Sequence, residues 1–306
     1  MKLRAAVCSG ILVGILVAWS GLGAHAAGPI RLATGPAGDF FWIMGKELCR
    51  VWSAEDLAAE VVETTGDREN LALVVSGKAD AALVSGFALA DFLAEQPGAP
   101  VVTVASCWKS AVHVMLNNEF IKTDTLRDLE GRHLYLGPEA SPYGNAVRRI
   151  LAGLGIKPYR YVREIAKSEL LGVMTDFIGR ELDGAVIVGP VADPMVRDIV
   201  GGTGGIMGLI PADQADVSAL SGAGLPVFAL TIPKETYPYQ TEDLVVIGVG
   251  TYLVARPDLS DETARKLAAG IFDNAGRIAA YFPRGGTLSV EEAAAHPVAP
   301  LHPGLK

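Results

Sequence analysis

The sequence is short of cysteine and of metal-ligand patterns. Only Cys49 and Cys107 lie beyond the N-terminal region. The single disulfide that two cysteines can form is too little to stabilise a chain of 306 residues by itself. They either form one bridge or remain buried free thiols, and we expect free thiols. The histidines beyond residue 26 show no ligand spacing with one another or with the cysteines. We therefore expect no metal and no cofactor.

Basic side chains are also scarce, with 26 Lys and Arg against 34 Asp and Glu and a net charge of −8. An acidic surface repels phosphate backbones, which argues against nucleic acid as a partner. Beyond the N-terminal region, no apolar run has the roughly twenty residues that a membrane-spanning helix needs. These absences point to a chain that acts outside the bilayer on a partner other than nucleic acid.

The N-terminus has the three parts of a secretory signal peptide. Lys2 and Arg4 are basic, residues 5–19 carry no charge, and Ala24-His25-Ala26 is a small-x-small cleavage pattern. The apolar run is too short for a membrane anchor, and Cys8 does not lie in a lipobox. We expect a cleavable signal peptide over 1–26 and a mature chain in the periplasm that begins near Ala27.

A supersecondary unit occurs twice in the mature chain. The first copy is expected to run as strand 30–34, glycine-proline loop 35–38, helix 40–51, strand 60–64, helix 66–75 and strand 81–84. The second copy has strand 132–136, loop 137–141, a helix through residue 151 and strand 185–188. Gly35 precedes Asp80 by 45 residues, and Gly137 precedes Asp183 by 46. Chance spacing of two ordinary βαβ segments is the alternative, but the shared loop chemistry favours a duplicated architecture.

Two similar α/β units in an exported chain predict a two-lobed periplasmic binding protein of type II, each lobe a central sheet flanked by helices. Residues 112–116 are expected to cross between lobes, and the chain returns through 227–232 and 245–254. Ser260 should cap a helix through Tyr281, and Ser289 with Glu292 a final short helix, both packed on the first lobe. The expected lobes are 27–115 with 246–306, and 116–245, in a monomer.

Ligands of open α/β sheets bind at the carboxyl ends of the strands, where helix N-termini offer free N–H groups and suit a carboxylate. Four loops should face this cleft, 35–41, 64–70, 85–87 and 138–145, and a fifth follows at 189–193. The candidate ligand-binding residues lie in these loops: Gly35, Gly38, Asp39, Phe40, Phe41, Thr65, Asp67, Arg68, Asn70, Ser85, Phe87, Ser141, Tyr143, Gly144, Asn145, Gly189 and Pro190.

Motifs in order along the chain carry a family resemblance. They are LATGPAG at 32–38, TG at 65–66 with ENL at 69–71, GKADAALV at 77–84, LRDLEGR at 126–132, TIP and TYP at 231–233 and 236–238, and PLHPG at 300–304. Together they resemble the solute-binding subunit of the TAXI group of TRAP transporters. The resemblance implies a type II binding fold, an ion-driven TRAP membrane permease as partner, and a small carboxylate such as glutamate or a 2-oxo acid as solute.

The chain departs from the family pattern in the cleft. Where the family has Gly-Ser-Gly-Thr-Arg, residues 140–144 read ASPYG, and the arginine is replaced by Gly144. Arg68 is either a substitute carboxylate clamp or a solvated helix residue. Asp39 and Asp67 are either helix N-caps or, if they face the cleft, groups that favour an amine. An aromatic wall for a less polar carboxylate is predicted from Phe40, Phe41, Phe87 and Tyr143, and the alternative for Phe40 or Phe41 is a place in the core.

Two other functions fit parts of the sequence. An enzyme on the same lobes is the less favoured one, because no histidine lies in a cleft loop to activate Ser141 and no carboxylates are paired by spacing. A ligand sensor for a membrane receptor kinase would have the same lobes and cleft. We therefore expect a solute-binding protein that is not an enzyme.

Overall fold

A computed structural model describes residues 28–137, 142–158, 160–161, 177–179, 181–279 and 298–306. The expected signal peptide over 1–26 and the capping box of Ser289 and Glu292 lie outside these residues. Among the helices of the described part of the chain, none is both long enough and apolar enough to cross a membrane.

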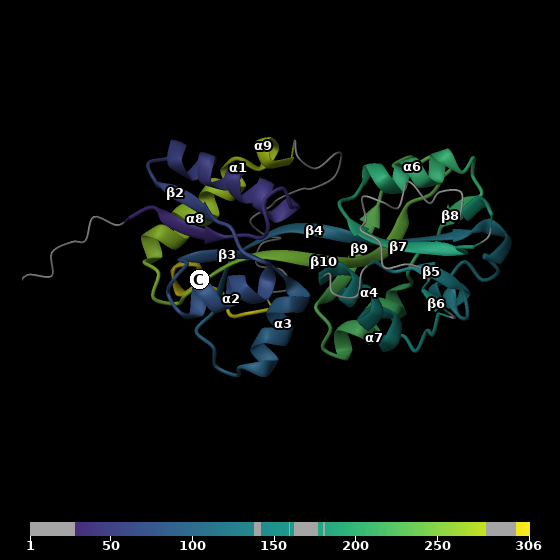
Figure 1. Cartoon of the computed structure of the whole chain (residues 1–306), viewed down its shortest axis with the longest axis horizontal. Coiled ribbons are helices and arrows are strands. Elements are labelled where there is room, and N and C mark those ends of the chain that lie inside the picture. The colour runs from purple at the N-terminus through teal and green to yellow at the C-terminus, as the bar shows by residue number, and fades with distance from the viewer. Residues whose placement is uncertain (1–27, 138–141, 159, 162–176, 180, 280–297) are drawn as a thin grey trace, which may run out of the picture.

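The described chain forms two α/β lobes side by side, joined by two long strands (Figure 1). Lobe 1 contains β1 (Ile30–Ala33), α1 (Phe40–Ala54), β2 (Ala59–Val62), α2 (Asp67–Val75), β3 (Ala81–Ser85), α3 (Gly86–Glu95), α8 (Asp261–Asp273), α9 (Ala275–Ala279) and the 3₁₀ turn η4 (Pro303–Leu305). Lobe 2 contains η1 (Asn118–Phe120), η2 (Leu126–Leu129), β5 (His133–Tyr135), α4 (Pro142–Gly153), β6 (Arg160–Tyr161), β7 (Gly184–Gly189), α6 (Pro194–Gly202), β8 (Met207–Leu209), α7 (Gln214–Gly222) and β9 (Val227–Ile232).

The crossing strands β4 (Val102–Asn117) and β10 (Leu244–Ala255) connect the lobes into one sheet of order β2-β1-β3-β10-β4-β7-β5-β6. In lobe 1, β10 pairs with β3 and β4, whereas in lobe 2 it pairs with β9 and β4 pairs with β7 and β8. The expected crossing strand 112–116 is therefore only the end of a 16-residue strand. It is longer because both of its faces are covered, so that nearly all of its residues are buried. The expected lobe boundaries fall inside these two strands, and the exact limits stay a prediction.

Helices cover both faces of the sheet in each lobe, and each covered face has its own apolar core. In lobe 1, α1 and α8 pack over one face and α2 and α3 over the other. In lobe 2, α4 and α7 cover one face and α6 the other. Helix α1 shows why the sequence folds this way, since Met44, Leu48, Val51 and Trp52 repeat at helical spacing and are all buried. The two-lobed type II fold is confirmed.

The expected duplication is present in the described elements. Strand β1 pairs in parallel with β2 and β3, and β5 pairs in parallel with β6 and β7. An aspartate before the last strand then closes each unit in the same way. The Asp80 N–H donates to the Arg31 carbonyl and its carboxylate accepts the Arg31 N–H, both at 2.9 Å. Asp183 makes the same two bonds with His133 at 2.8 Å. The equal spacing in the sequence thus reflects equal backbone geometry.

Asp80 should give the fold a measurable pH dependence. Burial opposes its ionisation, but the hydrogen bonds and the charge of Arg31 outweigh burial and lower the pKa of Asp80. A lowered folded pKa contributes stability above the unfolded pKa of about 3.9, and this contribution is lost as the pH falls through the folded pKa. We expect Asp80→Asn to cost about 1 kcal/mol at neutral pH, discounted for the partial exposure of the pair, and the cost to shrink as the pH falls below the unfolded pKa and through the folded one.

Urea unfolding of both proteins across this pH range measures the difference. Asp258→Asn is the control, because Asp258 pairs with Arg256 at 2.9 Å but is 69% exposed. A gap between wild type and Asp80→Asn that stays constant with pH would contradict the assigned role of the carboxylate.

The C-terminal helix is shorter than expected. Ser260 caps α8 by accepting the Thr263 N–H at 3.1 Å, as predicted, but α8 ends at Asp273 rather than Tyr281. Asn274 interrupts it, and its side-chain amide donates to the Gly270 carbonyl at 3.1 Å. Asparagine ends helices because its amide competes for backbone groups.

Both cysteines of the described residues, Cys49 and Cys107, are free and buried, as expected. Cys49 lies in α1, and burial raises the pKa of its thiol to about 12. Cys107 lies within β4, and burial also raises the pKa of its thiol. Both groups are therefore thiols at neutral pH.

Candidate functional site

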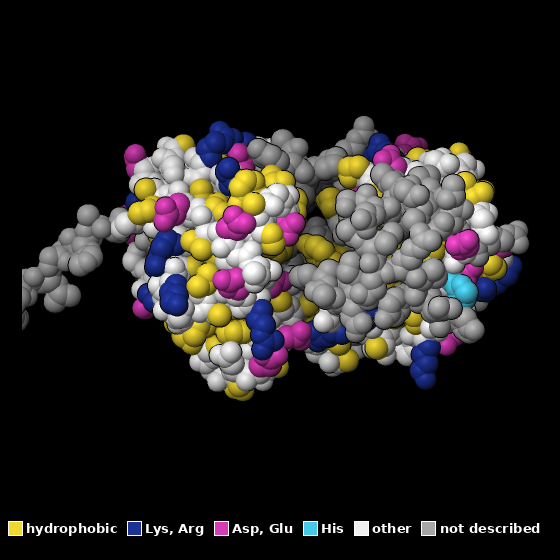
Figure 2. Space-filling model, in the orientation of Figure 1, with side chains coloured by type: hydrophobic (Ala, Val, Ile, Leu, Met, Phe, Trp, Pro, Cys, Tyr) yellow, Lys and Arg dark blue, Asp and Glu magenta, His cyan; other side chains and the backbone are white. Residues whose placement is uncertain are grey.

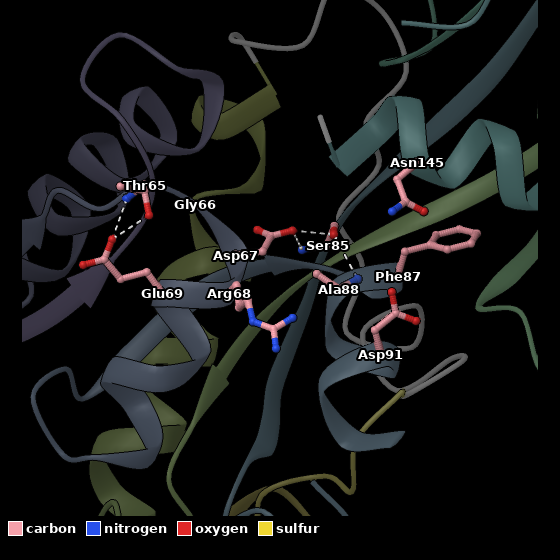
Figure 3. A pocket seen from close by; sticks show the side chains of 10 residues that line it. All are labelled: Thr65, Gly66, Asp67, Arg68, Glu69, Ser85, Phe87, Ala88, Asp91 and Asn145. Atoms are coloured by element: carbon pink, nitrogen blue, oxygen red, sulfur yellow. Dashed lines mark hydrogen bonds between the residues drawn. The ribbon is translucent and has the colours of Figure 1, made fainter. Parts of the chain in front are cut away.

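The junction of the lobes holds two adjoining cavities. Figure 2 shows this junction as a groove, with hydrophobic and acidic side chains of lobe 1 along its border. The aromatic cavity has a volume of about 330 Å³ and is lined by Thr34, Gly35, Pro36, Asp39, Phe40, Phe41, Thr65, Gly66, Asp67, Ser85 and Tyr143. The polar cavity, of about 380 Å³, is lined by Thr65, Gly66, Asp67, Arg68, Glu69, Ser85, Phe87, Ala88, Asp91 and Asn145 (Figure 3).

The topology of lobe 1 places these residues together. β1, β2 and β3 run parallel, so their carboxyl ends meet at one edge of the sheet, and α1, α2 and α3 begin there. Gly66, the N-cap of α2, has φ 130° and ψ −164°, a backbone region that is essentially restricted to glycine. Each cavity is completed by a residue of α4 from lobe 2, Tyr143 in one and Asn145 in the other.

The wall of the aromatic cavity is built on Trp108. Phe40 and Phe41 lie edge-on to this ring, with centroids 5.6 and 6.1 Å from it. Trp108 is buried in β4, while both phenylalanines are half-buried and pack against the core of lobe 1. Phe40 and Phe41 therefore serve as both core and wall. Phe87 lines the polar cavity and is otherwise buried in a core of lobe 2.

Asp67 is a buried carboxylate shared by both cavities. It is the first residue of α2, and its Oδ2 accepts hydrogen bonds from Ser85 Oγ at 2.5 Å and from the Ser85 N–H at 3.3 Å (Figure 3). Ser85 Oγ in turn accepts the Ala88 N–H and so caps α3. Burial raises the pKa of Asp67, although the bonds from Ser85 oppose the shift. The interpretation of Asp67 as an N-cap is wrong, because Gly66 occupies that position.

Asp39 and Tyr143 contribute further polar groups to the aromatic cavity. Asp39 occupies the N-cap position of α1 but makes no capping hydrogen bond with its side chain, and it is exposed. Burial raises the pKa of Tyr143, and the charges of Asp67 and Asp39 raise it further. The hydroxyl therefore remains a hydrogen-bond donor at neutral pH.

Asn70 supports the cavities from behind. Its side chain is fully buried, and its amide donates to the carbonyls of Thr34, at the end of β1, and Leu83, in β3. Its Oδ1 accepts a bond from Thr64 Oγ1 at 2.5 Å. It lines neither cavity, since its hydrogen-bonding groups are occupied by the loops that form them.

An arginine of α4 contacts the backbone on the lobe 2 side of the cleft. Arg148 Nη1 donates to the carbonyls of Gly137, which follows β5, and Gly144, in the first turn of α4, each at 3.0 Å. Gly144 itself is buried, and Asn145 is exposed. Ser141 lies outside the described residues.

Two ion pairs border the polar cavity. Arg68 is 81% exposed and contacts Glu95 Oε2 at 2.7 Å, so this pair has to open before Arg68 can clamp a solute. The clamp stays a prediction. Arg149 of α4 contacts Asp91 of α3 at 2.6 Å and lies over the Phe87 ring at 5.0 Å. These contacts hold the two lobes together beside the cleft.

Most predicted site residues meet at the cavities. The exceptions among the described residues, which line neither cavity, are Gly38, Asn70, Gly144, Gly189 and Pro190. Gly189 is paired within the sheet opposite Ala111 at the crossing. Several lining residues were not predicted, namely Thr34, Pro36, Gly66, Glu69, Ala88 and Asp91. All but Asp91, which lies one turn into α3, are in or next to the predicted loops. Contact with a ligand stays a prediction for the whole set.

The aromatic cavity combines an apolar wall with negative charge. Asp39 and Asp67 line it, and its described lining includes no lysine or arginine. Within the described residues, no three His, Cys, Asp or Glu side chains form a possible metal site. The arrangement can enclose a small molecule and orient it by hydrogen bonds and charge.

A model of the NMT1-like family matches residues 32–306. No curated protein matches the sequence. Among solved structures, a TctC solute-binding protein from Polaromonas, without ligand, has a TM-score of 0.54 and 14% identity over 82% of this chain and 84% of that one. A Xanthomonas citri protein bound to a chloride ion has a TM-score of 0.51 and 11% identity over 86% and 92%. At these identities the likeness concerns the fold.

Proposed function

Because this chain belongs to the NMT1-like family, we propose that it is an extracytoplasmic solute-binding subunit. It captures a small organic carboxylate in the cleft between the lobes and delivers it to a TRAP-type membrane permease, as a member of the TAXI group. The observation that supports this most directly is the aromatic cavity, which lies between the lobes at helix N-termini. Its volume of about 330 Å³ suits an amino acid or another small acid.

The fold supports capture by closure. Within the described residues, β4 and β10 carry the chain between the lobes, and the Arg149–Asp91 ion pair also bridges them. Each cavity is lined from both lobes. A rotation about the crossing strands changes the distance between α4 and the loops of lobe 1, as in hinge closure around a ligand. The backbone N–H groups at the start of α1 and α4 are then available to a carboxylate.

A thermal-shift screen of the purified protein tests the proposal. We expect one chemical class among amino acids, dicarboxylates, 2-oxo acids and aromatic acids to raise the melting temperature dose-dependently. At a concentration one hundred times Kd, the gain is about 2.7 kcal/mol, which corresponds to several degrees for a chain of this size. Absence of any shift at millimolar concentrations across all four classes would contradict solute capture.

A further inference from the structure

The Asp67 carboxylate has no cationic partner within the described chain. The side chain is 6% exposed, and Oδ2 accepts both of its hydrogen bonds, which come from Ser85. In Figure 3 the other oxygen points away from Ser85. It accepts no hydrogen bond from the described residues, and Asp67 lines both cavities. Since buried carboxylates are normally paired, the missing partner is to be sought in the cavity.

The helix ends around the cavity are already supplied with negative charge. A helix N-terminus attracts anions, but Asp67 lies in the first turn of α2 and Asp39 at the N-cap of α1. The chain's own carboxylates therefore occupy positions at which an anionic solute group would otherwise be stabilised. Arg68, which lines the polar cavity, pairs with Glu95, and Arg149 pairs with Asp91, which also lines it.

Apart from the hydroxyl groups of Thr34, Thr65 and Ser85, the remaining side chains of the aromatic cavity are mostly apolar. The rings of Phe40 and Phe41 lie against Trp108, and Tyr143 approaches from lobe 2. Aromatic faces bind apolar groups and also attract ammonium groups through their negative π faces. The cavity is thus complementary to a molecule with a positive charge beside an apolar body.

We infer that the solute carries a protonated amine that pairs with Asp67 and an apolar body that packs on Phe40, Phe41 and Tyr143. The inference rests on the proposed function and narrows its solute class. Apolar amino acids meet both requirements, because they carry an amine and an apolar side chain. Their carboxylate can face the N-terminus of α4, which has no acidic residue in its first turn. Dicarboxylates and 2-oxo acids lack the amine and leave Asp67 without a counter-ion.

Calorimetric titration of the purified protein with matched compounds tests the inference. The aromatic series is phenylalanine, phenethylamine and 3-phenylpropanoate, and the aliphatic series is leucine, isoamylamine and 4-methylpentanoate. We expect the amino acid and the amine of at least one series to bind at least about tenfold more tightly than the deaminated acid, as loss of a charged hydrogen-bond partner predicts.

Substitution of Asp67 tests whether the preference for amines depends on its carboxylate. Asp67→Asn keeps the size of the side chain and should lower the affinity for the amines about 10- to 100-fold. The affinity for the deaminated acids should be unchanged or slightly higher. Asp261→Asn is the matched control, since Asp261 is also the first residue of its helix but is 57% exposed and lies away from both cavities. It should bind the amines as the wild type does.

The outcomes separate the inference from the proposed function. Equal binding of acids and amines, or unchanged amine affinity in Asp67→Asn, overturns the inference and leaves solute capture in place. If only dicarboxylates or 2-oxo acids bind, the inference is likewise overturned and solute capture stays in place. If no compound of either series and none of the screened acids binds, the inference and the proposed function are both overturned. The comparison of acids with amines on the wild-type protein holds whether or not the Asp67→Asn variant folds.

Discussion

Asn70→Ala is expected to lower the free energy of unfolding by about 3–4 kcal/mol. The change removes three buried hydrogen bonds, worth about 1 kcal/mol each, and leaves the carbonyls of Thr34 and Leu83 without this donor. Since Asn70 connects β1, β3 and the loop that holds Thr64, the variant should also lose affinity for the solute without having lost any contact with it. Urea unfolding followed by circular dichroism measures the first effect, and calorimetric titration the second.

Asn118→Ala is the matched control for this prediction. The Asn118 amide also donates to a carbonyl, that of Gly205 at 2.7 Å, but the bond is exposed. We expect this variant to cost less than about 1 kcal/mol and to leave solute binding unchanged. Similar losses of stability in the two variants would show that burial of the Asn70 network does not have the importance assigned to it.

Tyr237→Phe is expected to cost about 2–3 kcal/mol, although it removes a single oxygen. The hydroxyl lies 2.7 Å from His113 Nε2 and accepts the Asp193 N–H at 2.9 Å. His113 Nδ1 is 3.2 Å from the Ile187 carbonyl, so we assign the ring proton to Nδ1 and the hydroxyl donates to Nε2. Both bonds are buried, and phenylalanine offers neither, so two polar groups lose a partner.

Tyr239→Phe provides the comparison within the same loop. Tyr239 is 69% exposed, so we expect its substitution to change the free energy of unfolding by less than about 0.5 kcal/mol. Equilibrium unfolding of both variants distinguishes them. If Tyr237→Phe proved as stable as the wild type, the connection between β4 and the start of α6 through Tyr237 would not stabilise lobe 2.

Tyr237 also explains why a sequence motif can be typical of a family without marking its binding site. The Thr-Tyr-Pro segment contributed to the family resemblance, yet its tyrosine ties β4 to the loop before α6 inside lobe 2. It lines neither cavity. A motif of this kind is needed for the stability of the fold, and other residues determine which solute binds.

The local order of the fold was predictable because the signals are local. The last strands of the two repeated units, β3 and β7, are short and almost entirely apolar runs next to glycine. The turn that ends in Asp80 before β3 recurs as the turn that ends in Asp183 before β7. The extent of β4 was not predictable in the same way. Its residues beyond 112–116 mix Ser, Cys, Trp and Lys, and they form a strand because β10, distant in the sequence, pairs along them.

The candidate site was predictable as a set of loops and less so as a set of side chains. Asp67 and Asn70 are three residues apart on one helix, yet one faces the cavities and the other supports them. That difference depends on how α2 is rotated against β1 and β3, which the spacing of residues in the sequence does not indicate. The contact of Trp108 with Phe40 was not predictable for a related reason, because Trp108 lies on a strand that is distant in the sequence.

The shared sheet limits what the duplicated architecture permits. β10 comes from the C-terminal part of the chain, but it supplies lobe 1 with the strand between β3 and β4. A cut at either expected lobe boundary would leave each half with unpaired strand edges. The two lobes therefore repeat the same architecture but cannot be exchanged independently. A chimera that takes lobe 2 from a relative has to preserve the register of β4 and β10 as well as the cleft.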